Sequence, residues 1–108
     1  FSGGARIAAS IALNNKAFKG IICCAAGVGQ NLQVGSHQIV YCIVGNEDFN
    51  YLEVNSSIEA NPNIGLITFN GGHQWPRKEI LHQVVFIWYL QKTRQKSFID
   101  NYYQLLLN

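Results

Sequence analysis

The chain has 108 residues, enough for one small domain, and 48% of them are hydrophobic, which allows a real core and argues against disorder. The net charge of +2 comes from eight basic and six acidic residues and is too small for a nucleic-acid-binding surface. We therefore expect no nucleic-acid partner. No apolar run reaches the ~18 residues of a membrane span, so we also expect no transmembrane segment.

The first half of the chain predicts a helix followed by two buried strands. Residues 2–15 place apolar residues, many of them alanine, at i, i+4 spacing, which is typical of a helix packed closely on a sheet. Residues 20–25 and 38–44 are short apolar runs, typical of strands buried on both faces in a parallel sheet. Between them, residues 26–37 are rich in glycine and polar side chains and predict a loop.

The second half continues the alternation of helices and strands. A helix is predicted over residues 48–59, a turn at 61–63 and a strand over 64–69. Helical pattern resumes at Pro76, a residue that suits a first helical position. Candidates for inward side chains in the first of these helices include Phe49, Leu52 and Val54. In the last helical segment one apolar stripe consists of Ile80, Val84 and Trp88, with Leu81 and Val85 beside it, and a shorter second stripe consists of Phe98, Tyr102 and Leu106. This order predicts an α/β fold with a parallel sheet.

The three cysteines are predicted to be buried free thiols. Their number is odd, and Cys23 and Cys24 are adjacent within an apolar run, whereas Cys42 lies in the next predicted strand. No cysteine or histidine spacing matches a zinc site, so we expect no metal. Free thiols favour a reducing compartment such as the cytoplasm, which a signal peptide on a preceding segment would overturn.

Ser2 is the candidate nucleophile. It lies just before the first helix and is followed by Gly3 and Gly4, and a nucleophilic serine on a strained turn requires small neighbours. The backbone N–H of Gly3 could donate one hydrogen bond to an oxyanion, an interaction that lowers the barrier by ~3 kcal/mol. A serine at this position is also typical of a helix N-cap, and Ser-Gly-Gly alone would favour that simpler interpretation.

Asp48 and His73 are the candidate acid and base. Asp48 follows the second strand, and His73 follows the third strand after Gly71 and Gly72, so both are expected at the carboxyl edge of the sheet. An acid at this place orients and stabilises the imidazole, which acts as general base. Asp48 could also cap the following helix, and both roles can hold although one carboxylate cannot serve both fully. Glu47 is an alternative acid one position early.

His37 and His82 are weaker candidates for the base. His37 precedes a strand and is therefore expected at the opposite edge of the sheet, and His82 lies within the last predicted helix. The chain order serine, acid, histidine is the order of the α/β-hydrolases, and it is the combination of the three positions that favours a triad.

Three segments resemble α/β-hydrolases of the esterase and phospholipase/carboxylesterase-like type. Residues 1–8 resemble the nucleophile elbow, residues 45–50 the acid loop, and residues 69–76 the histidine loop. The resemblance extends to about Leu90. It implies Ser2 as nucleophile, Asp48 as acid, His73 as base and the Gly3 N–H as half of the oxyanion hole.

The implied activity is hydrolysis of carboxylic esters, or of related acyl bonds in a small-molecule substrate, without metal or organic cofactor. Trp75, beside the histidine, could line the substrate pocket, but packing against the final helix is the preferred interpretation. Nothing in these motifs separates an ester from a peptide bond as substrate, and a non-catalytic binding or structural module of the same fold is a further alternative.

The resemblance also implies that residues 1–108 form one partial domain, the C-terminal part of the hydrolase fold. The strands expected before the elbow and the loop that would donate the second oxyanion hydrogen bond do not occur in the sequence. We expect the N-terminal half of the same domain to complete it. Residues 1–108 alone are then predicted to be inactive and to expose the edge of their first strand.

Overall fold

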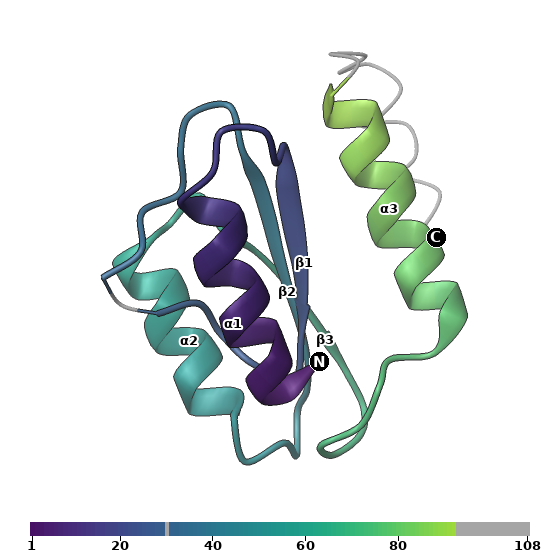
Figure 1. The fold of residues 1–108 in the computed structure, drawn as a ribbon. Coiled ribbons are helices and arrows are strands. Elements are labelled where there is room, and N and C mark those ends of the chain that lie inside the picture. The colour runs from purple at the N-terminus through teal and green to yellow at the C-terminus, as the bar shows by residue number, and fades with distance from the viewer. Residues whose placement is uncertain (30, 93–108) are drawn as a thin grey trace. The chain divides into compact units, whose positions relative to one another are not determined.

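The computed structural model describes residues 1–29 and 31–92. Helices and strands follow one another in the order α1 (Ser2–Leu13), β1 (Gly20–Cys24), β2 (Ile39–Gly45), α2 (Tyr51–Ala60), β3 (Gly65–Phe69) and α3 (Lys78–Lys92), as Figure 1 shows. The chain forms two compact units, residues 1–76 and 77–108. The first unit holds the sheet with α1 and α2, and the described part of the second unit holds α3.

The sheet is parallel, as predicted, and its strand order is β1-β2-β3. Cys23 lies opposite Cys42 in the first pair, and Gly45 lies opposite Phe69 at the end of the second. Six of the seven residues of the central strand β2 are buried, which agrees with its uninterrupted apolar sequence. Because β2 and β3 end side by side, the loops that follow them lie next to each other.

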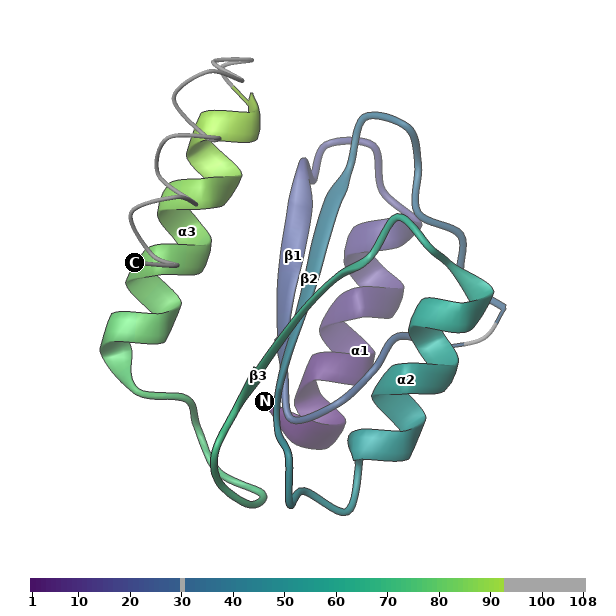
Figure 2. The same cartoon turned by 180° about the vertical axis from the view of Figure 1, so that it is seen from behind.

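Helices α1 and α2 lie on the same face of the sheet, which Figures 1 and 2 show from opposite sides. Helix α1 buries three alanines, Ala5, Ala9 and Ala12, whereas the larger Ile7 and Ile11 are exposed. Small side chains allow a helix to approach a sheet closely, so the predicted role of the alanine-rich pattern is confirmed.

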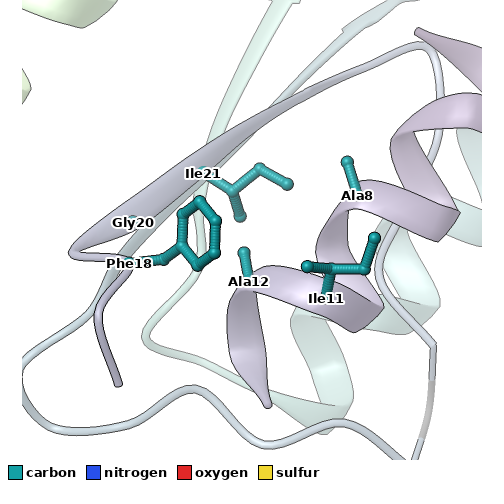
Figure 3. A pocket seen from close by; sticks show the side chains of 6 residues that line it. All are labelled: Ala8, Ile11, Ala12, Phe18, Gly20 and Ile21. Atoms are coloured by element: carbon teal, nitrogen blue, oxygen red, sulfur yellow. The ribbon is translucent and has the colours of Figure 1, made fainter. Parts of the chain in front are cut away.

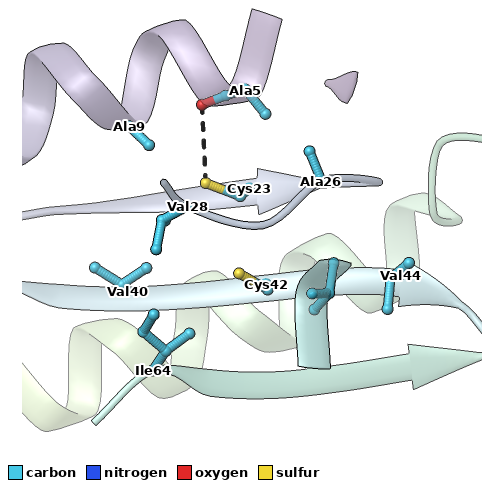
Figure 4. Close-up of a cluster of buried hydrophobic side chains, with 10 residues drawn as sticks. Ala5, Ala9, Cys23, Ala26, Val28, Val40, Cys42, Val44 and Ile64 are labelled. Carbon is cyan, nitrogen blue, oxygen red and sulfur yellow. Dashed lines mark hydrogen bonds between the residues drawn. The ribbon is translucent and has the colours of Figure 1, made fainter. Parts of the chain in front are cut away.

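The core of this unit lies between the sheet and the two helices. Figure 4 shows Cys23 and Cys42 on neighbouring strands, with the Cys23 thiol 4.0 Å from the Ala5 carbonyl oxygen. All three cysteines are buried and free, as predicted. Burial raises the pKa of the Cys24 thiol, and a hydrogen bond with Cys23 together with burial raises the pKa of Cys42.

An irregular segment connects β1 to β2, as the glycine-rich sequence predicts. Side chains of and around α2 hydrogen-bond its carbonyl groups: Ser57 Oγ donates to the Val28 oxygen at 2.8 Å and Asn61 Nδ2 to the Leu32 oxygen at 3.0 Å. These bonds satisfy polar groups that a crossover helix would have paired internally. They also explain why the polar Ser57 is buried on the inner side of α2.

Helix α2 begins later than the sequence indicates, at Tyr51 rather than at residue 48. Of its expected inward residues, Val54 is fully buried, whereas Phe49 and Leu52 are each 76% exposed, so the prediction was wrong for these two. The reason is that residues 48–50 form a turn instead of a first helical turn. The predicted stripe at residues 98, 102 and 106 lies outside the described residues.

Candidate active site

Hydrogen bonds that involve backbone groups join the loop after β2 to the end of β3 and to the loop that follows it. The Asn46 N–H donates to the Phe69 oxygen and the Glu47 N–H to the Gly71 oxygen, both at 2.9 Å. In return the Gly71 N–H donates to Asn46 Oδ1 at 3.1 Å. We call residues 45–48 the acid loop and residues 70–73 the histidine loop; these bonds hold the two loops together.

Gly45 allows this close approach. A Cβ atom at Gly45 would overlap the carbonyl oxygens of Gly71 and Gly72, which are backbone atoms and cannot rotate away. The chain bends at residues 70–74, which include Gly71 and Gly72, and it does so without a positive φ at either glycine. A Cβ at Gly72 would meet nothing within 4 Å, so the requirement for glycine is stricter at Gly45 than at Gly72.

Asp48 and His73 meet directly at this edge of the sheet. His73 Nδ1 lies 3.0 Å from each carboxylate oxygen of Asp48. The Asp48 side chain is fully buried and that of His73 is 25% exposed. A carboxylate only accepts hydrogen bonds, so Nδ1 carries the proton and Nε2 is the nitrogen left with a lone pair. This tautomer is the one that a general base requires.

The Asp48 carboxylate is itself fixed by its surroundings. Oδ1 also accepts the N–H of Asn50 at 2.7 Å, and Asn50 Nδ2 donates to the Ala25 oxygen at 2.9 Å, at the end of β1. Asp48 therefore bonds the imidazole and also closes the turn before α2, although the N-cap of that helix is Asn50 and not Asp48. Glu47, the alternative acid, is exposed.

Ser2 has a strained backbone at the first turn of α1. Its φ is +52°, and Ser2 and Ala25 are the two non-glycine residues with a positive φ in the described part of the chain. Such a conformation costs about 1–3 kcal/mol and is found more often at functional sites. The N-cap of α1 is Phe1, so the simpler interpretation of Ser2 as an N-cap is not what the structure shows.

The N–H groups at the start of α1 are available to a ligand. No side chain caps this end of the helix, and its first backbone N–H groups have no intrahelical partner. Gly3 is exposed, and its N–H belongs to this set. A Cβ at Gly4 would meet nothing within 4 Å, and one at Gly3 would meet only the end of the Arg6 side chain at 3.9 Å, so the space beside these two glycines is open.

Phe1 brings the serine turn next to the histidine. Its ring centroid lies 5.1 Å from that of His73. Among the described residues no hydrogen bond joins the Ser2 hydroxyl to the imidazole. The structure therefore brings Asp48 and His73 into direct contact and places the residue adjacent to Ser2 against His73.

Aromatic side chains surround the histidine. The centroids of the Phe49 and His73 rings are 4.3 Å apart, and those of the stacked Trp75 and Phe1 rings are 4.8 Å apart. Phe49 and Trp75 are 76% and 59% exposed. Sequence reasoning singled out Trp75 but missed Phe1 and Phe49. Phe49 directly follows the candidate acid, and this adjacency was the signal that could have identified it.

The other candidates lie elsewhere. His37 is exposed and precedes β2, at the opposite edge of the sheet from Asp48, and His82 belongs to α3 in the second unit. Within residues 1–29 and 31–92, no group of three or more His, Cys, Asp or Glu side chains could hold a metal ion. None of the helices described has the length and apolar character required to cross a membrane.

Comparisons with known proteins give no relative for this chain. A scan against family models, a search of curated proteins and a search of solved structures each found no match. The geometry at the carboxyl edge of the sheet is therefore the basis for assigning a function.

Proposed function

We propose that this chain carries the catalytic triad of a serine hydrolase that cleaves carboxylic esters, with Ser2, His73 and Asp48 as its members. The observation that carries the proposal is the hydrogen bond from His73 Nδ1 to the buried Asp48 carboxylate at 3.0 Å. The strained serine turn beside the same histidine supplies the third member. Strain at a serine that begins a helix is typical of a nucleophile elbow.

The reaction follows from these positions. Ser2 Oγ attacks the ester carbonyl carbon while His73 Nε2 takes its proton, and Asp48 stabilises the imidazolium that forms. The bond from the carbonyl carbon to the alcohol oxygen then breaks, and Nε2 gives its proton to that oxygen. Water repeats the two steps on the acyl-serine, releasing the acid and restoring Ser2. No cofactor takes part in this sequence.

The oxyanion would be stabilised at the start of α1. The Gly3 N–H is one donor, and the positive end of the helix dipole favours the negative charge that develops there. The resemblance to esterases implies that a second donor comes from a loop in the preceding half of the domain.

The outer edge of β1 supports a further part of the proposal. β1 is at the edge of the sheet, and beside it lies a hollow of about 380 Å³ lined by Ile11, Phe18 and Ile21, among other residues, as Figure 3 shows. An unpaired strand edge next to apolar side chains is an arrangement that proteins usually cover. We infer that the N-terminal half of the domain covers it and that residues 1–108 alone are inactive.

Labelling with a fluorophosphonate probe tests the proposal. The full-length polypeptide that contains residues 1–108 is expected to react at Ser2, and its Ser2→Ala variant is expected not to react. Residues 1–108 alone are expected to label poorly and to hydrolyse activated esters no faster than free histidine. Absence of labelling at Ser2 in the full-length polypeptide would instead favour a non-catalytic module.

A substrate panel separates an esterase from a peptidase of the same chemistry. We expect p-nitrophenyl esters to be cleaved by the full-length polypeptide and aminoacyl amides to be cleaved more slowly. Preferential cleavage of the amides would reassign the activity to peptide bonds while leaving the triad intact.

A further inference from the structure

Three aromatic side chains lie together beside the candidate base, two of them exposed and the third, Phe1, half-buried. We call Phe1, Phe49 and Trp75 the aromatic cluster. The centroid of the Phe49 ring lies 4.3 Å from that of His73. The centroid of the Phe1 ring lies 5.1 Å from that of His73, and Phe1 also stacks on Trp75. Large apolar side chains grouped on an exposed surface mark ligand sites more often than isolated ones do. Phe1 and Phe49 contact His73 directly and Trp75 stacks on Phe1, so the aromatic cluster lies beside the proposed general base.

Phe49 is held in its exposed position by its neighbours. Asp48 and Asn50 on either side are both buried, and the Asn50 N–H donates to Asp48 Oδ1 at 2.7 Å. Asn50 Nδ2 is bonded in turn to the Ala25 oxygen. The backbone around Phe49 is therefore fixed while its ring is 76% exposed. An exposed ring on a backbone held in this way is well placed to bind an apolar group of a substrate.

The chemistry of ester cleavage determines which part of the substrate lies there. The imidazole must donate its proton to the alcohol oxygen, which requires that oxygen to be about 2.6–3.2 Å from His73 Nε2. The rest of the alcohol then extends over the groups that flank the imidazole. The acyl part, bonded to Ser2 and held at the Gly3 N–H, lies on the other side of the reacting carbon.

We propose that the aromatic cluster, with Phe49 as its principal member, binds the alcohol portion of the ester and selects substrates whose alcohol carries an apolar ring. The proposal rests on the proposed function and adds the substrate class to it. Aromatic rings that pack against each other contribute to binding beyond the apolar area they bury, so removing Phe49 is expected to have a measurable effect on such substrates.

Two isomeric esters test the proposal without a difference in size or composition. Benzyl acetate carries its ring on the alcohol, and methyl phenylacetate carries it on the acyl group. In the full-length polypeptide, Phe49→Ala is expected to lower kcat/KM for benzyl acetate about 10-fold or more, and that for methyl phenylacetate less than about 3-fold. Phe49→Leu is expected to keep part of the preference.

Leu52→Ala is the matched control. Leu52 is equally exposed, at 76%, and lies on α2 away from the aromatic contacts, so its removal is expected to leave both rates unchanged. A displaced His73 would lower both rates equally, whereas loss of a binding surface lowers only one. The ratio of the two rates therefore reports binding of the alcohol and not the position of the base.

Each outcome decides between the proposals. An equal fall for both esters, or a larger fall for methyl phenylacetate, would overturn the assignment of the aromatic cluster while leaving the triad in place. Absence of both ester hydrolysis and fluorophosphonate labelling would overturn the triad, and the substrate class with it. A fall in kcat/KM for benzyl acetate alone supports both the triad and the role of the aromatic cluster.

Discussion

At the scale of single residues, Gly45 controls how closely the acid loop approaches the histidine loop. Gly45→Ala is expected to push the two loops apart, because the added Cβ would meet two backbone carbonyl oxygens. Overpacking of this kind typically costs about 1–3 kcal/mol. The same shift would separate Asp48 from His73, so we expect the fluorophosphonate labelling rate of the full-length polypeptide to fall at least about 10-fold.

Gly72→Ala is the control for this variant, because a Cβ at Gly72 would meet nothing within 4 Å. It is expected to keep both the melting temperature and the labelling rate. Equal rates in Gly45→Ala and the unmodified protein would show that the approach of the two loops does not determine reactivity.

The positions of the candidate acid and base followed from the sequence, but their surroundings did not. Asp48 and His73 could be predicted because parallel strands end at one edge of a sheet, so residues that follow two such strands meet. The exposed position of Phe49 could not be predicted, because the periodic pattern does not show that residues 48–50 form a turn in which the Asp48 carboxylate accepts the Asn50 N–H. Helix α2 begins only at Tyr51, and Phe49 lies exposed in the turn before it.

At the scale of elements, an ion pair joins α1 to α2. Arg6 Nε and Nη2 donate to the two carboxylate oxygens of Glu53 at 2.6 and 2.7 Å. The hydrogen bond with Arg6 lowers the pKa of the Glu53 carboxyl. Both side chains are more than a third exposed, so solvent screening limits the contribution of the pair to about 0.2–1 kcal/mol.

The lowered pKa of Glu53 gives this contribution a defined pH dependence. Stabilisation is complete above the pKa of the unfolded chain, near 4.5, and is lost as the pH falls through the lower folded value. Glu53→Gln is therefore expected to reduce the unfolding free energy by less than about 1 kcal/mol at neutral pH, and by less still in acid. Urea unfolding of the full-length polypeptide at several pH values measures this difference.

Glu59→Gln provides the comparison on the same helix. Glu59 is exposed and makes no ion pair among residues 1–29 and 31–92, so its replacement is expected to leave stability nearly unchanged. A Glu53→Gln effect that stays constant down to about pH 3 would show that the charge of Glu53 is not what stabilises the helix pair.

The helices and strands could be predicted from the spacing of apolar residues, but the residues at which they begin and end could not. The apolar run over residues 38–44 predicted a buried strand, and six of the seven residues of β2 are buried. The inner face of α2 was harder to recognise, because it includes Ser57, whose hydroxyl is bonded to the Val28 oxygen. A hydrogen bond between distant segments leaves no periodic signal in the sequence.

At the scale of the molecule, the first unit brings residues far apart in the chain to one edge of its sheet. Ser2 comes from the start of α1, and Asp48 and His73 come from the ends of the acid loop and the histidine loop, which follow β2 and β3. The described part of this unit also leaves the outer edge of β1 unpaired. Both features agree with the proposal that the triad lies here and that a preceding half of the domain completes the oxyanion hole.

The central claim is that Ser2 forms the acyl-enzyme, and trapping that intermediate tests it most directly. The full-length polypeptide is mixed with p-nitrophenyl acetate, quenched with acid during the first turnover and mapped by peptide mass spectrometry. We predict one acetyl group on the Ser2 side chain, and none there in Ser2→Ala. Turnover of the ester with an unmodified Ser2, or with the acetyl group on a lysine or histidine instead, would contradict the assignment.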